Sequence, residues 1–132
     1  MKTSTPPLIP DSLVRRATEA LKRVVEPMDG VHLALLCTPD GREIASLHGR
    51  SAWLAERLPA LTASLMALAG SAALETGHGA CRRLRCETEM GTLLFQAVGG
   101  DQPAIICLVI DDNMLLGRAL WAAAEVASQL RG

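Results

Sequence analysis

Aromatic side chains are almost absent from this chain of 132 residues, which has no Tyr, one Phe and two Trp. A chain with so few aromatic rings lacks the stacking platform on which single-stranded nucleic acids bind. Its net charge of −1 at pH 7 also argues against general nucleic-acid binding, because that binding depends on many uncompensated Lys and Arg side chains. We therefore expect no nucleic-acid partner.

Several motifs and segments are missing as well. The chain has no Gly-rich nucleotide-binding motif and no Gly-x-Ser-x-Gly nucleophile turn. No run of about 18 uninterrupted apolar residues is present, so we expect no membrane insertion. The start, "MKTSTPPLIP", has no apolar segment typical of a signal peptide, and this favours a cytoplasmic protein.

The cysteines and histidines do not form a metal-binding pattern. The four cysteines make no Cys-x-x-Cys pair, and the three histidines are far apart in the sequence. We therefore expect free thiols, no metal and no cofactor, and we interpret Cys37 and Cys107 as core residues of apolar strands. Cys81 and Cys86 lie among arginines, which can lower a thiol pKa, so a thiol enzyme is the weakest of the functional alternatives.

Composition and turn residues divide the chain into two parts. Residues 1–10 include Pro6, Pro7 and Pro10 and are predicted to be a flexible N-terminal arm. Residues 11–132 have the length and the apolar content of a single domain, since 49% of the whole chain is hydrophobic.

Hydrophobic periodicity predicts alternating groups of helices and strands. We expect helices over residues 13–26, 51–76 and 114–130, and strands over residues 31–37, 43–47, 83–88, 92–98 and 104–110. Asp40-Gly41 and Glu89-Met90-Gly91 are turn sequences that join neighbouring strands as hairpins, so the sheet should be largely antiparallel and the fold α+β. The strand over 104–110 is continuously apolar, which places it at the centre of the sheet.

The long helix over residues 51–76 has two apolar faces, and Pro59 within it predicts a kink or a short first turn. One face is a seam that we expect to pack on the sheet, formed by Leu54, Leu58, Leu61, Leu65, Leu68 and Ala72. The opposite face carries small, uncharged residues and is the predicted dimer interface: Ala60, Ala63, Ala67, Gly70 and Leu74. An alternative is that another helix of the same chain covers it.

The strand that follows this helix alternates apolar and charged residues. Arg83, Arg85 and Glu87 lie on its charged side. If the strand is a sheet edge, its open backbone groups can pair with a second copy, so we include these three residues in the predicted interface.

Four stretches in this order resemble the roadblock/LC7 family: "VHLALLCTPDGREIAS", "LTASLMALAGSAA", "ETEMGTLLFQAV" and "IICLVIDDNMLLGRALWAAAEVA". The resemblance covers residues 13–130. It implies a five-stranded sheet with the long central helix on one face and the N- and C-terminal helices on the other. It also implies a homodimer joined through the long helices and the adjacent edge strands.

The same resemblance implies a function without an active site. Bacterial members similar to this chain bind small Ras-like GTPases, some stimulating GTP hydrolysis, and eukaryotic relatives are dynein light chains or scaffolds. The family has no shared catalytic residue, so the chain is expected to be a non-enzymatic binding module. The main alternative is a small-molecule-sensing domain, for which Gln96 and His32 are the inward-facing polar candidates.

Overall fold

The computed structural model describes residues 6–48 and 56–131. The first helical segment is α1 (Asp11–Ala20), which continues into one π-helical turn, η1 (Leu21–Val25). The remaining elements are β1 (Val31–Cys37), β2 (Glu43–His48), α3 (Leu58–Glu75), β3 (Arg83–Glu87), β4 (Gly91–Val98), β5 (Ala104–Asp111) and α4 (Leu116–Arg131). The predicted order of elements is therefore confirmed.

The five strands form one antiparallel sheet in the order β2-β1-β5-β4-β3. The two predicted hairpins supply the pairs β1–β2 and β3–β4, and β5 joins them by pairing with both β1 and β4. The predicted central place of β5 is confirmed, and its burial explains its apolar sequence. β2 and β3 are the two edges of the sheet.

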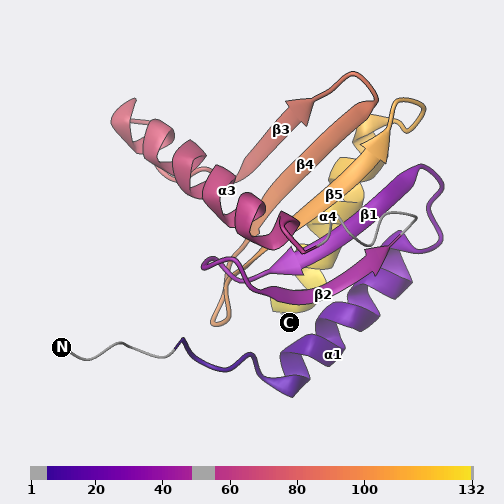
Figure 1. The fold of residues 1–132 in the computed structure, drawn as a ribbon, viewed down its shortest axis with the longest axis horizontal. Coiled ribbons are helices and arrows are strands. Elements are labelled where there is room, and N and C mark those ends of the chain that lie inside the picture. Colours follow the sequence, from indigo (N-terminus) through magenta and orange to yellow (C-terminus); the bar gives the residue numbers. More distant parts are fainter. Residues whose placement is uncertain (1–5, 49–55, 132) are drawn as a thin grey trace.

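The helices cover the two faces of the sheet unequally (Figure 1). α1, η1 and α4 pack on one face around a large apolar core that includes Leu21, Leu36, Leu94, Ile106 and Val126. On the other face α3 lies alone across the strands, over a smaller core formed by Leu33, Leu35, Cys37, Ala63, Met66, Phe95, Ile105 and Cys107. The family's expected layer arrangement is thus present.

Two helix boundaries differ from the prediction. α3 begins at Leu58, so Pro59 lies in its first turn, where a missing backbone N–H costs no hydrogen bond. The described part of the helix therefore has no kink at Pro59. The alternative, a short turn before the main helix, falls on residues 51–55, which together with Leu54 of the predicted seam lie outside the described residues. α4 begins at Leu116 because Asp111 first closes a turn, its Oδ1 accepting from the backbone N–H groups of Asn113 and Met114.

Gly91 is needed where β4 begins beside β5. A Cβ atom at this position would lie 2.0 Å from the carbonyl oxygen of Ile110, which is part of the sheet backbone and cannot rotate away. Any larger residue would therefore push β4 away from the central strand.

We predict that Gly91→Ala lowers the free energy of unfolding by roughly 2 to 3 kcal/mol, the range of an overpacked core position. Gly117→Ala is the matched control, because a Cβ at Gly117 in α4 would meet no other atom within 4 Å outside its own helix backbone, and alanine favours helices. Urea denaturation measures the free energy of unfolding of both variants. Equal stability of the Gly91→Ala variant and the wild type would contradict the close approach.

Candidate self-association and partner interface

α3 contacts the sheet through a narrow set of side chains and leaves the rest of its surface apolar. Its buried residues are Pro59, Thr62, Ala63 and Met66. Four of its leucines remain exposed: Leu61 by 54%, Leu65 by 40%, Leu68 by 69% and Leu74 by 69%. Helical spacing places the first three on one face of α3 and Leu74 on another. By length and composition alone, α3 is apolar enough to cross a membrane. An exposed apolar surface of this kind marks an interaction site.

The predicted assignment of the two helix faces is wrong in part. Leu61, Leu65 and Leu68 belong to the seam that was expected to pack on the sheet, yet they are exposed. Ala63 was expected in the interface, yet it is buried against the sheet. Of the other predicted interface residues in this helix, Ala60, Ala67 and Leu74 are exposed and Gly70 is half-buried.

The physical reason for this exchange lies in the sheet. The face beneath α3 already carries large side chains, including Leu33, Leu35 and Phe95. Smaller groups such as Thr62 and Ala63 therefore let the helix approach, whereas a row of leucines would hold it further away. Leu61, Leu65 and Leu68 consequently lie on the solvent-exposed side of α3.

β3 is an open edge beside this helix. All its residues except the half-buried Leu84 are exposed, and it pairs only with β4 in the sheet. The Arg83 Nε donates a hydrogen bond to Gln96 Oε1 at 3.0 Å, and Arg85 and Glu87 form an ion pair at 3.5 Å. In Figure 1 the C-terminal end of α3 extends past β3, so the apolar helix overhangs the open edge.

The small core under α3 contains two protonated thiols. Burial raises the pKa of Cys37 to about 12, with a further rise from the Asp40 charge. Burial also raises the pKa of Cys107 to about 12, opposed in part by the Thr62 hydroxyl and raised further by Cys37. These two cysteines are packing residues, as predicted, because a thiol that stays protonated is a poor nucleophile.

The Thr62 hydroxyl in the same core is fully buried and has no hydrogen-bond partner among the described residues. The neighbouring Cys107 sulfur is too weak an acceptor to satisfy it. An unsatisfied hydroxyl weakens the contact between α3 and the sheet.

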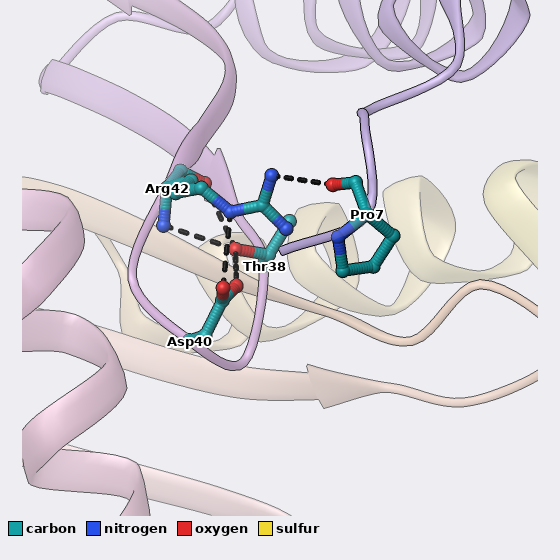
Figure 2. Close-up of polar contacts among 4 residues, drawn as sticks. All are labelled: Pro7, Thr38, Asp40 and Arg42. Carbon is teal, nitrogen blue, oxygen red and sulfur yellow. Dashed lines mark hydrogen bonds and ion pairs between the residues drawn. The ribbon is translucent and has the colours of Figure 1, made fainter. Parts of the chain in front are cut away.

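The β1–β2 hairpin ends in a polar cluster (Figure 2). Thr38 donates a hydrogen bond to Asp40, and the Arg42 Nε lies 3.0 Å from Asp40 Oδ2. Bonds to Thr38 and Arg42 hold the pKa of the Asp40 carboxyl below its usual value. Arg42 Nη1 also donates to the Pro7 carbonyl at 2.7 Å, which attaches the N-terminal arm to the hairpin.

This hairpin tip also supports the start of α3. Gly41 has φ +90°, and a Cβ there would lie 3.1 Å from the Ala60 Cα. Glycine at this position thus allows both the turn and the close approach of the helix. The segment "LLCTPDGREIAS" is thus the hairpin that its Asp40-Gly41 turn predicts.

The other candidate sites among the described residues give weaker support for ligand or metal binding. An open hollow of about 330 Å³ lies beside His32 and Asp111, whose side chains approach to 3.9 Å. Gln96, the second candidate for a sensor pocket, bonds to Arg83 instead. Among the described residues, no three His, Cys, Asp or Glu side chains gather as a metal site.

Comparison with known proteins identifies the architecture. A sequence profile of the Roadblock/LC7 domain matches residues 17–110. No match was found among curated protein sequences. Among solved structures, Myxococcus xanthus MglB has a TM-score of 0.81 at 16% identity and covers 95% of this chain and 92% of its own.

Two further solved structures are similar. The gliding protein MglB of Thermus thermophilus has a TM-score of 0.80 at 20% identity, covering 98% of this chain and 96% of its own. An MglB described with a tetrameric arrangement has a TM-score of 0.81 at 21% identity, covering 98% and 95%. Identities this low establish the shared fold.

We predict that the protein loses stability as the pH rises above about 9. Both buried thiols have a raised pKa in the folded state, so their contribution is fully present below the unfolded-state pKa and is lost as the pH rises toward 12. Each thiol adds a slope of up to about 1.4 kcal/mol per pH unit. Urea denaturation across this pH range measures it.

The control for this slope is Cys86→Ser, which removes an exposed thiol and should leave the pH dependence unchanged. Cys37→Ala combined with Cys107→Ala should flatten it. The chain has no Tyr, which removes one other group that ionises in this range. Parallel profiles for the wild type and the double variant would count against the assignment.

Proposed function

Because the chain belongs to the Roadblock/LC7 domain family, we propose that it is a non-catalytic homodimer that binds and regulates a Ras-like small GTPase in the cytoplasm. The observation that carries this proposal is the exposed leucine face of α3 next to the open edge strand β3.

Self-association would bury the apolar surface that one protomer leaves open. Leu61, Leu65 and Leu68 share one face of α3, and each would gain about 1 to 2 kcal/mol on leaving water. A second copy provides the same surface, so a two-fold axis lets both helices be covered at once. Ala60 and Ala67 are small enough to admit a close helix neighbour.

The surface of a two-fold symmetric dimer, here called the platform, could regulate a GTPase partner by binding one of its conformations. A rigid surface can hold one arrangement of the partner's switch segments and so change its hydrolysis rate without adding a catalytic group. If this platform selects the hydrolytic arrangement, the protein acts as a GTPase activator. If it binds both nucleotide states equally, it acts as a scaffold.

We predict a dimer at micromolar concentration by light scattering, and a monomer for Leu68→Glu, since an unpaired carboxylate would be buried in the interface. Leu68 is exposed in the protomer, so this change should leave the fold intact. Leu115→Glu is the matched control, being 71% exposed at the other face of the sheet, and should stay dimeric. A monomeric wild type would refute the interface.

For the GTPase, we predict that the dimer binds a Ras-like small GTPase from the same cell and that Leu68→Glu binds more weakly. Calorimetry with GDP and with a non-hydrolysable GTP analogue measures binding in each state. Phosphate release measures turnover. Tighter binding of the GTP state with faster release identifies an activator, whereas equal binding without a rate change identifies a scaffold. Absence of binding to every such GTPase rejects the proposal.

A further inference from the structure

A groove lies between α4 and the edge strand β3, on the sheet face opposite α3 (Figure 1). Its volume is about 270 Å³, and it is lined by Arg83, Arg85, Leu94, Leu116 and Leu120. Leu94 is buried and belongs to the core that α4 shares with the sheet. The groove therefore has an apolar floor, an apolar wall on α4 and a cationic wall on β3.

The two arginines of this groove are held by contacts that leave donors free for a ligand. Leu84 packs beneath α3, so the side chains of Arg83 and Arg85 lie on the α4 face. The hydrogen bond from Arg83 Nε to the buried Gln96 uses one of the five N–H donors of that guanidinium. Arg85 pairs with Glu87 at 3.5 Å, an exposed contact that water weakens. Each guanidinium can therefore still bind a carboxylate.

The outer side of α4 next to this groove is apolar as well. Trp121 is 58% exposed, and helical spacing places the exposed Gly117 and Ala124 on the same side of the helix. A second hollow, of about 260 Å³, adjoins this side and is lined by Met28, Gly117, Arg118 and Trp121. Tryptophan and arginine are the side chains that most often anchor protein interfaces.

Gly117 is not required by the fold. Its φ is not positive, and a Cβ atom there would meet nothing within 4 Å outside its own helix backbone. Alanine would favour the helix more than glycine does. On the exposed side of α4, however, the missing side chain lets the backbone of a second helix come close.

The two hollows carry charge of one sign. Among the described residues that line them, three are arginines and none is Asp or Glu, although the whole chain has a net charge of −1. An apolar surface between arginines is complementary to a partner that is apolar along its middle and acidic at its margins. A membrane surface also attracts Trp and Arg side chains, but a flat bilayer would leave both hollows unfilled.

We propose that the outer side of α4 and its groove with β3 bind an amphipathic helix of a partner protein, with Asp or Glu along the margins of that helix. Its apolar side chains fill the groove and cover Trp121, while Gly117 admits its backbone. Its carboxylates bind the arginines of the two hollows. This docking surface lies opposite α3 and does not depend on the proposed homodimer, so the protein would bind a second protein while α3 is covered.

A synthetic peptide tests this surface. The probe is "ELAELLEALEELLE", an amphipathic helix with glutamates at its margins, and its matched control "KLAKLLKALKKLLK" reverses every charge and keeps the apolar side. Anisotropy of labelled peptides measures affinity. We expect saturable binding of the acidic probe with a Kd of about 100 µM or tighter, and binding of the control at least about tenfold weaker. In a Trp53→Phe background Trp121 is the only tryptophan, so unlabelled acidic probe should shift its emission to the blue.

Two sets of variants locate the probe on the protein. Gly117→Ala should bind it at least about tenfold more weakly, because the added methyl group holds the probe helix away, without any loss of stability to urea. Arg83→Gln combined with Arg85→Gln should weaken binding by a similar factor, about tenfold. Arg15→Gln is the matched control for charge, since Arg15 is exposed on α1 and lines neither hollow, and it should bind as the wild type does.

Several results would overturn the proposal. These are no saturable binding of the acidic probe, equal binding of both peptides, or unchanged affinity of the Gly117→Ala and double arginine variants. Flotation with phosphatidylglycerol vesicles tests the membrane instead, and vesicle binding without probe binding would assign the surface to lipid. Leu68→Glu, which alters the proposed dimer surface on α3, should bind the probe unchanged. Failure of the homodimer and failure of this surface therefore give different results, and loss of probe binding in Leu68→Glu would place the probe on α3.

Discussion

The structure depends on an imbalance between the two faces of one sheet. Three helical segments, α1, η1 and α4, cover one face and share a large apolar core with it. α3 alone covers the other, where the core is small and the helix keeps its leucines in water. A single helix cannot both cover five strands and bury its own outer side, so the domain is complete as a fold but has an unused apolar surface. A second copy or another partner is the simplest way to remove that surface from water.

The hairpin between β1 and β2 shows how local turn chemistry positions this surface. Gly41 allows the tip to lie against the first turn of α3, while Thr38, Asp40 and Arg42 tie the tip together. Arg42 then reaches the Pro7 carbonyl, so the N-terminal arm is attached at the same place. The beginning of α3 is consequently fixed by backbone geometry and ionic contacts, whereas its C-terminal end projects past β3 (Figure 1).

Strand identity, hairpin turns and the central place of β5 could be predicted because each depends on neighbouring residues or on a continuously apolar sequence. The orientation of α3 could not. Its leucine seam and its small-residue strip both follow helical spacing, so periodicity shows two apolar faces without saying which one meets the sheet. The answer lies in residues far away in the sequence, since Leu33, Leu35 and Phe95 fill the space that leucines of α3 would need. Ala63 was misassigned for this reason, although Ala60, Ala67 and Leu74 are exposed. The missing backbone N–H of Pro59 could be recognised from the sequence, but the start of the helix at Leu58, directly before it, could not.

An open edge strand such as β3 is a hazard, because its free N–H and C=O groups can accept any extended chain. Charged residues on one side of β3 limit this risk, yet a strand of uniform charge would also repel its own copy. The order Arg83, Arg85, Glu87 avoids a uniform charge, because the exposed side of this strand carries both signs. α3 contacts β3 and extends past it, so the open edge and the exposed leucines of the helix lie next to each other. A partner large enough to cover the helix would therefore also reach the edge strand.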